Sequence, residues 1–190
     1  MECEKTPLDG VVILTPRRFG DARGWFTEAW NARTLAGAGV DAAFVQDNHS
    51  FSAPKGTLRG LHYQSHPHAQ AKLVRCSAGA IWDVAVDVRD GSPTFGRWFG
   101  TELSAGNGRQ LFVPVGFLHG FVTLTENAEV QYKCTDFYAP DCDGGVRWDS
   151  ASLAIDWPVE GAPVLSEKDA AAPDFSGWAT PFGRDGGPRQ

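Results

Sequence analysis

Three residues whose side chains can take part in proton chemistry stand at strand positions that alternation would turn inward. Lys72 shares its strand face with the apolar Val74 and Cys76, and an inward ammonium loses hydration at high cost unless an anion or acceptor meets it. By the same alternation Tyr132 falls on an apolar face, and His62 on a face lined by small and polar residues. Taken alone, an inward tyrosine is usually a core residue and a strand histidine a structural one. Because lysine is almost never buried without a partner, the three together favour a shared pocket.

The histidines are numerous enough for a metal site to be weighed. His66 and His68 form an H-x-H pair, and the segment Pro114–His119 has the pattern P-x-G-x-x-H. This arrangement resembles the cupin barrels, a jelly-roll superfamily whose pattern is H-x-H, then a glutamate, then P-x-G-x-x-H. Lys72 stands where that pattern has its carboxylate, and an ammonium repels a divalent cation instead of binding it. We therefore expect no catalytic metal.

The elements that must position these residues are many short strands. The clearest is Ile81–Arg89, which alternates with a period of two and presents one apolar face. Further strands are expected at Val11–Leu14, Phe44–Gln46, Thr57–Gln64, Ala71–Ser77, Trp98–Leu103, Gln110–Val113, Gly120–Thr125 and Ala128–Phe137. Helix is scarce, and its best candidate is Thr27–Ala36, ended by Gly37. Strands at such short spacing predict an all-β sandwich or barrel.

Length and composition bound the class of protein. The 190 residues fit one domain, and a net charge of -6 argues against a nucleic-acid binder. No apolar run approaches the roughly 20 residues of a membrane span, and Met1–Lys5 lacks the start of a signal peptide. The four cysteines have no zinc-ligand spacing, so reduced thiols of a cytoplasmic protein are expected. From about residue 177 we expect a loosely held tail.

A series of motifs, in order from about residue 8 to 175, resembles one enzyme family over nearly the whole chain. They occupy residues 20–28, 46–50, 58–64, 72–75, 83–87, 92–96, 114–121, 132–138, 155–158 and 165–169. The family is the dTDP-4-dehydrorhamnose 3,5-epimerases, which are cupin-fold enzymes of deoxysugar biosynthesis. The resemblance implies an all-β, cupin-type jelly-roll barrel with short peripheral helices, forming a single domain over residues 1–190.

What the resemblance implies for function is a cofactor-independent epimerase. Its substrate would be dTDP-4-dehydro-6-deoxy-D-glucose, inverted at carbons 3 and 5 to give dTDP-4-dehydro-L-rhamnose. A ketone at carbon 4 acidifies the hydrogens on carbons 3 and 5, so a base that works at neutral pH can remove them and form an enolate. Because the substrate carries its own electron sink, no nicotinamide, flavin or metal is implied.

The catalytic roles also follow from the resemblance. His62 would be the base, with Asp169 as its carboxylate partner. Lys72 would face the charge that grows on the carbonyl oxygen, and Tyr132 would return a proton from the opposite side of the sugar. The implied substrate-binding positions are Arg23, Phe26, Glu28, Gln46, Asp47, Asn48, Arg59, His119, Tyr138, Asp143 and Lys168.

The binding positions divide by the part of the substrate they would meet. Arg23 and Arg59 resemble the diphosphate-binding arginines of the family, since the guanidinium is a planar, permanently charged fork. Glu28 and the run Gln46–Asn48 resemble the thymidine-side contacts, and Tyr138 resembles the ring that stacks on the base.

For two of the implied binding positions, Arg59 and Asp143, contact with the substrate depends on local geometry. Arg59 has the opposite strand parity to His62, so it shares the same cavity wall only through a bulge or a reach around an edge. Asp143 stands where the family commonly has glutamate, which is one methylene longer, so its reach to the substrate stays open. The family forms homodimers in which the N-terminal segment enters the neighbour's pocket, and a homodimer is implied here.

Other activities stay open at this point. A relative that inverts only carbon 3 or carbon 5 of a dTDP-4-keto-6-deoxyhexose, for a secondary metabolite, would keep the same base and acid. A catalytically dead sugar-nucleotide binding cupin is a third hypothesis, against which His62, Lys72, Tyr132 and Asp169 argue together. A metal-dependent cupin dioxygenase or isomerase is a fourth.

Overall fold

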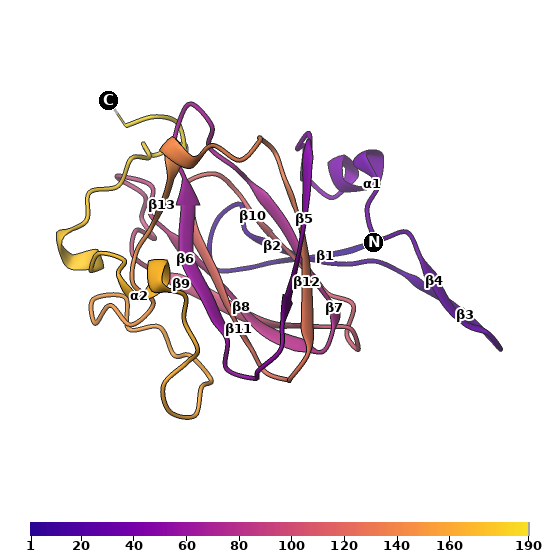
Figure 1. The fold of residues 1–190 in the computed structure, drawn as a ribbon. Coiled ribbons are helices and arrows are strands. Elements are labelled where there is room, and N and C mark those ends of the chain that lie inside the picture. The colour runs from indigo at the N-terminus through magenta and orange to yellow at the C-terminus, as the bar shows by residue number, and fades with distance from the viewer. Residues whose placement is uncertain (190) are drawn as a thin grey trace.

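In a computed structural model that describes residues 1–189, two antiparallel sheets face one another (Figure 1). Residues along their strands alternate between the buried inner face and the outer face. One sheet has the strand order β1-β2-β10-β7-β12-β5, and the other β13-β6-β11-β8-β9. The strands are β1 (Glu2–Lys5), β2 (Val12–Thr15), β3 (Arg18–Asp21), β4 (Gly24–Thr27), β5 (Gln46–Ser52), β6 (Leu58–Gln64), β7 (Lys72–Ala78), β8 (Ala80–Asp87), β9 (Trp98–Ser104), β10 (Gln110–Val113), β11 (Phe117–Thr123), β12 (Ala128–Cys134) and β13 (Asp143–Gly145).

Helix is scarce and lies at the periphery. The helical elements are α1 (Ala32–Gly37), α2 (Glu167–Ala170) and the 3-10 turns η1 (Pro140–Cys142) and η2 (Phe175–Gly177). Apart from the consecutive pairs β1–β2 and β8–β9, neighbouring strands in these two sheets come from distant parts of the chain, as in a jelly roll. The predicted all-β jelly-roll barrel with short peripheral helices is therefore confirmed. Within residues 1–189, no helix is long and apolar enough to cross a membrane.

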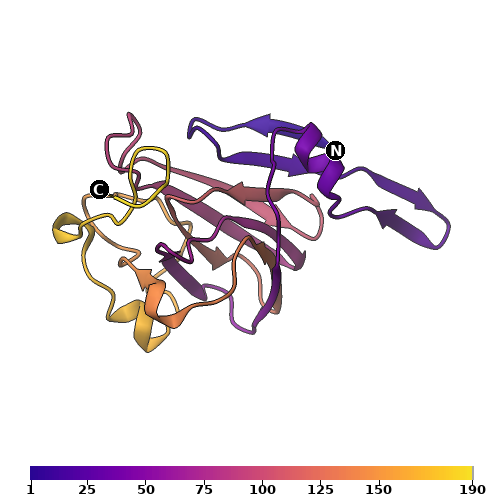
Figure 2. The same cartoon turned by 90° about the horizontal axis from the view of Figure 1, so that it is seen from above.

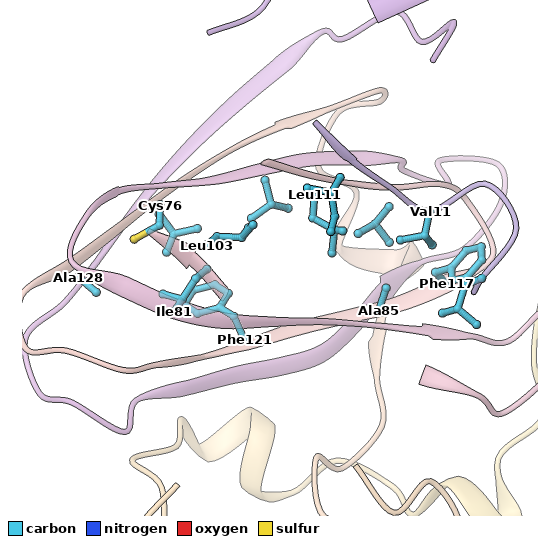
Figure 3. Close-up of a cluster of buried hydrophobic side chains, with 14 residues drawn as sticks. Val11, Cys76, Ile81, Ala85, Leu103, Leu111, Phe117, Phe121 and Ala128 are labelled. Atoms are coloured by element: carbon cyan, nitrogen blue, oxygen red, sulfur yellow. The ribbon is translucent and has the colours of Figure 1, made fainter. Parts of the chain in front are cut away.

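The apolar core lies between the two sheets. Figure 3 shows its side chains enclosed by the ribbons, among them Cys76, Leu111 and Phe121. Viewed from above, the sheets form two layers, with the C-terminal segment at one side (Figure 2). That segment covers a second cluster on the outer face of β8 and β11, which includes Val86 and Phe182.

Strand β8 is consequently buried on both faces. Its apolar residues Val84 and Val86 pack outward into the second cluster, whereas Ile81 and Ala85 pack into the barrel core. The expectation of one apolar face described only the outer side. The alternate positions of the inner side include Asp83, which is fully buried.

Two expected elements differ from the structure. The segment predicted as a helix from residue 27 to 36 begins only at Ala32, because Asn31 caps it and accepts hydrogen bonds from the backbone N–H groups of Arg33 and Thr34 at 3.0 and 3.2 Å. Thr27, the first residue of the predicted helix, is instead the last residue of β4, which pairs with β3 in a hairpin that projects from the barrel (Figure 1). Strand β5 runs from Gln46 to Ser52, far beyond the predicted end at Gln46.

The C-terminal segment differs from the loosely held tail that composition indicated. Phe182 is only 1% exposed and meets the ring of Tyr63 edge-on, with centroids 5.8 Å apart. The carbonyl of Phe182 also accepts a hydrogen bond from the backbone N–H of Asp90 at 3.0 Å. An aromatic anchor thus fixes a segment rich in Gly and Pro. Gln190, the last residue of the predicted tail, lies outside the described residues.

Candidate active site

A short polar contact inside the barrel joins His62 on β6 to Asp169 on α2. Nε2 of His62 lies 2.5 Å from Oδ1 of Asp169, and Asp169 is 4% exposed. The helix begins at Ser166, whose hydroxyl accepts the backbone N–H of Asp169 at 3.1 Å. Burial alone would raise the pKa of Asp169, but the hydrogen bonds and charge of His62 outweigh it and hold the pKa below its ordinary value. The carboxylate therefore stays ionised beside the imidazole.

Lys72 and Tyr132 face the same interior from two neighbouring strands. On β7 and β12, Tyr132 pairs with Val74 and Cys134 pairs with Lys72, so the lysine and tyrosine stand two positions apart on one face. The ammonium of Lys72 lies 6.0 Å from the ring centroid of Tyr132. Burial lowers the pKa of Lys72, partly offset by nearby acids that include Asp83, and burial raises the pKa of Tyr132. Tyr132 thus keeps its proton well above neutral pH.

These four residues line one cavity of about 200 Å³. They come from four separate elements, β6, β7, β12 and α2. The lining residues are Ser50, Arg59, His62, Lys72, His119, Phe121, Tyr132, Ser166, Lys168 and Asp169. Strand parity and the family motifs both placed His62, Lys72 and Tyr132 inward, and the structure brings them together with Asp169.

A bulge brings Arg59 to the same cavity. On β11, His119 pairs with His62 and Phe121 with Arg59, so one residue of β11 faces two residues of β6. Gly60 permits this close approach, because it has φ +137° and an added Cβ would lie 2.6 Å from the Cα of Gly120. The condition set by the parity of Arg59 is met in this way.

Arg59 is held toward the edge of the cavity. Its guanidinium donates to the hydroxyl of Ser52 at 3.3 Å and to the carbonyl of Phe51 at 3.1 Å. These are neutral partners, so its charge is available to an anion.

The predicted thymidine-side residues of β5 divide by face. Gln46 and Asn48 have the inward parity, and the Gln46 amide oxygen accepts the backbone N–H of Tyr138 at 2.9 Å. Asp47 has the outward parity and forms an ion pair with Lys133 at 2.8 Å. With Glu28 it lines a different cavity, of about 300 Å³, on the outer face of the sheet.

Three predicted binding residues gather at one edge of the site. Lys168 lines the cavity and donates to Asp143. The hydroxyl of Tyr138 donates to the same carboxylate at 3.3 Å. Asp143 therefore reaches two side chains despite its shorter length, and Tyr138 is 60% exposed with its ring free to stack.

Arg23 and Phe26 are not near this cavity in the single chain. Both belong to the projecting β3–β4 hairpin (Figures 1 and 2). The side chain of Arg23 is 90% exposed and pairs with Asp21 at 2.6 Å. Phe26 is 69% exposed.

Sequence reasoning missed several residues of the site. Ser50, Phe121 and Ser166 line the cavity, and Asp83 lies 2.8 Å from Nε2 of His119 through its Oδ1. A signal existed for Ser166, because the serine three residues before Asp169 is a typical helix cap. Alternation identified only the apolar face of the strand that carries Asp83, so the opposite face, on which Asp83 lies, was given no role.

Two of the three histidines of the cupin metal pattern, His66 and His68, are not among the residues that line the cavity, whereas His119 is. Nε2 of His66 lies 3.0 Å from the carbonyl of Gly186, and Nδ1 of His68 lies 3.3 Å from Asp136. Among residues 1–189, no three His, Cys, Asp or Glu side chains form a group that could hold a metal ion.

The barrel thus encloses a histidine–carboxylate pair, a buried lysine and a buried tyrosine around one cavity. A base, a cation and a phenol that keeps its proton are the groups that enolisation and reprotonation of a carbonyl compound require. Fold and site together define a jelly-roll protein with an acid–base pocket.

Comparison with known proteins identifies the family. The sequence model described as dTDP-4-dehydrorhamnose 3,5-epimerase matches residues 5–177. A curated relative, the dTDP-4-dehydrorhamnose 3,5-epimerase of Salmonella typhimurium, is 53% identical over 170 residues, covering 89% of this chain and 92% of the relative. The chain belongs to the dTDP-4-dehydrorhamnose 3,5-epimerase family, as its motifs indicated.

Two solved structures have the same fold. The dTDP-4-dehydrorhamnose 3,5-epimerase of Bacillus anthracis, solved with TDP and PPi bound, matches with a TM-score of 0.89 and 50% identity over 92% of this chain and 99% of its own. The dTDP-6-deoxy-D-glucose-3,5-epimerase of Legionella pneumophila, solved with dTDP-4-keto-L-rhamnose, matches with a TM-score of 0.90 and 45% identity over 100% of this chain and 98% of its own.

Proposed function

We propose that the protein epimerises dTDP-4-dehydro-6-deoxy-D-glucose at carbons 3 and 5, giving dTDP-4-dehydro-L-rhamnose. The observation that carries the proposal is the meeting of His62, Asp169, Lys72 and Tyr132 at one cavity in a member of this family. Each of the four supplies a function that the reaction needs.

The first half of the reaction makes an enolate. His62 takes the proton from the carbon beside the ketone, and the electron pair of the broken C–H bond moves into a C=C bond while negative charge develops on the carbonyl oxygen. Asp169 holds the imidazole in place and stabilises its positive charge, because the carboxylate is ionised at 2.5 Å. The ammonium of Lys72 stabilises the developing oxyanion, and such a donor in a dry site contributes about 3–4 kcal/mol.

The second half inverts the centre. Tyr132 gives its phenolic proton to the other side of the enolate carbon, and the C–H bond re-forms there while the carbonyl is restored. The raised pKa of Tyr132 favours this role, since a buried phenol keeps its proton until the enolate needs it. His62 then releases its proton to water and Tyr132 regains one, so each inverted carbon takes up one solvent hydrogen.

The nucleotide part of the substrate is bound by residues at the edge of the cavity and by residues from a second copy of the chain. Arg59 and Lys168 line the cavity and offer two cations to the diphosphate. Tyr138 is exposed and offers an aromatic ring to the base. The hairpin with Arg23 and Phe26 projects outward, and Trp25 on it is 58% exposed. We place this hairpin in the pocket of a partner subunit, so that the active form is a homodimer.

The site of action is proposed to be the cytoplasm. All four cysteines are free thiols, and Cys76 and Cys134 are buried, which suits a reducing compartment.

The deciding experiment is turnover of the 4-keto sugar nucleotide in deuterated water, followed by proton NMR. Two deuterons in each product, one at carbon 3 and one at carbon 5, are expected. One deuteron would instead assign the chain to the single-carbon epimerases, and binding without any exchange would make it a sugar-nucleotide binding protein.

A further inference from the structure

A second histidine–carboxylate pair lies beside the first. Nε2 of His119 on β11 is 2.8 Å from Oδ1 of Asp83 on β8. His119 is the antiparallel partner of His62, so two imidazoles occupy adjacent positions on neighbouring strands and each has its own carboxylate. Both histidines line the cavity, whereas Asp83 is not among the lining residues.

The surroundings of Asp83 are costly for a carboxylate. Asp83 is 0% exposed. Among residues 1–189, its Oδ2 is one of the few fully buried side-chain nitrogen or oxygen atoms without a hydrogen-bond partner. A buried charge that is only half satisfied lowers stability, and an apolar residue would fit a barrel core better. A carboxylate at this place therefore points to a role in the cavity.

Asp87 provides the contrast on the same strand. It stands four residues further along the same face and is also 0% exposed. Its oxygens accept hydrogen bonds from Arg89 at 2.7 and 2.9 Å, and from Ser92 and Thr94 at 2.6 Å each. Asp87 is thus a satisfied structural acid that holds a turn together, which Asp83 is not.

Although Oδ2 of Asp83 has no hydrogen-bond partner, the charge of Asp83 is felt by the ammonium of Lys72. Asp83 acts electrostatically on Lys72, whose pKa burial lowers and the Asp83 charge raises. Lys72 lines the cavity and must stay protonated in a dry place, and the carboxylate of Asp83, which does not line the cavity, favours that state.

We propose that Asp83 is a positioning residue of the epimerase: it fixes His119 through the Nε2 proton and places a negative charge directly behind this side of the cavity. With Nε2 engaged, Nδ1 is the ring nitrogen of His119 left for the substrate. In the neutral ring Nδ1 is an acceptor, which suits a hydroxyl of the sugar. The inference rests on the proposed function, because the role assigned to Asp83 is a role in the proposed epimerisation.

Other charged groups also act on this corner of the barrel, and a pH effect must be judged against them. The titratable groups on the elements packed around Lys72 are Arg59 and His62 on β6, His119 on β11, Tyr132 and Cys134 on β12, Asp143 on β13, and Lys168 and Asp169 on α2. None of these is altered when Asp83 is changed to Asn, so a shift between the two proteins reports the Asp83 charge.

The test compares Asp83→Asn with Asp87→Asn. Asn at position 83 keeps the shape and can still accept the Nε2–H of His119, but it removes the charge. We expect kcat to fall about 10- to 100-fold, as for partners that orient metal-bound histidines, with KM changed less than about threefold. The alkaline limb of the kcat profile should move to lower pH, because Lys72 then loses its proton more easily. Asp87→Asn should lower stability and leave kcat and that limb unchanged.

An unchanged kcat and an unmoved alkaline limb in Asp83→Asn would overturn the proposal. A fall in kcat and a shift of the alkaline limb in Asp87→Asn, equal to those in Asp83→Asn, would overturn it as well. A measurement on the unaltered protein covers the case in which Asp83→Asn does not fold. Nitrogen-15 NMR of the histidine rings, with His119 assigned from His119→Gln, should show a proton on Nε2 of His119 from pH 6 to 9. A lone pair on Nε2 would refute the pairing, whereas loss of all turnover in the unaltered protein would refute the proposed function instead.

Discussion

Replacement of His62 by Asn is the most direct perturbation of the proposed chemistry. Asn is close to His in size and can donate a hydrogen bond to Asp169, but it cannot accept and release a proton at neutral pH. The pocket would therefore keep its shape and its cations while it loses its base.

The size of the effect can be worked from the site. General base catalysis contributes about 10²- to 10⁴-fold, so kcat should fall by that factor, or about 3–5 kcal/mol of transition-state stabilisation. Asp169 is 4% exposed and exchanges its 2.5 Å imidazole partner for an amide, and even complete loss of that hydrogen bond costs only about 1–3 kcal/mol of stability. For a chain of this length that lowers the melting temperature by about 2–12 °C, at about 2–4 °C per kcal/mol. The activity loss would thus far exceed any loss of folded protein.

The assay is hydrogen exchange at carbons 3 and 5 in deuterated water, with dTDP affinity measured by calorimetry. Exchange at both carbons should drop together, and affinity for dTDP should change little because the nucleotide contacts lie elsewhere. The matched control is His49→Asn. His49 pairs with Glu129 at 3.0 Å on the outer side of the barrel and is 52% exposed, so its replacement should leave exchange intact.

Exchange at the unaltered rate in His62→Asn would remove His62 from the role of base. Exchange lost at one carbon and kept at the other would show that a second base serves the second carbon. Either result refutes the single-base reasoning, while weak dTDP binding would show that the substitution damaged the pocket as a whole.

Three further outcomes follow from other parts of the structure. Tyr132→Phe should keep hydrogen removal but lose inversion, so that label enters recovered substrate faster than product forms; equal rates of both would contradict the role of the phenol. Hydrogen bonds, above all from Arg89, overcome the effect of burial and hold the pKa of Asp87 below its unfolded value, so this stabilisation is present at neutral pH and is lost as pH falls below about 4. Urea unfolding from pH 7 to 3 should therefore show a smaller acid loss in Asp87→Asn than in the unaltered protein, and parallel curves would count against this source of stability. Mixed Arg23→Ala and His62→Asn subunits should regain activity that neither has alone, and no recovery in verified mixed dimers would place the hairpin outside the partner's pocket.

Strand alternation predicted the inward residues well because its period is geometric. Any residue two positions from a core residue on a regular strand shares its face, and this places Lys72 beside Val74 and Tyr132 beside Val130 in the barrel. The rule fails where the strand is irregular. Arg59 enters the cavity only through the bulge at Gly60, and the sequence alone does not show where a register shift falls.

Tertiary burial explains the remaining differences. Strand β5 carries Gln46, Asn48 and Ser50 on its inner face, and an inner face so polar resembles a loop until the cavity is known. Alternation predicted one apolar face for strand β8, and Asp83 lies on its other face, which turns into the barrel with Ile81 and Ala85. The C-terminal segment covers the outer face with Phe182, so both faces are buried. Asp169 joins the site from a four-residue helix, and only the family resemblance placed it there.

The size of the cavity decides how the substrate is divided between the barrel and its surroundings. The space beside His62 and Tyr132 is about 200 Å³, below the roughly 300–1,000 Å³ of pockets that enclose drug-sized ligands. A nucleoside diphosphate sugar exceeds that space, so on the proposed function only the sugar ring enters. The diphosphate and base must then lie across the edge where Arg59, Lys168 and Tyr138 stand. At this edge Tyr138 is 60% exposed and the side chain of Lys168 is 55% exposed. In the proposed homodimer, the projecting hairpin of the second copy would bring the guanidinium of Arg23 to the diphosphate there.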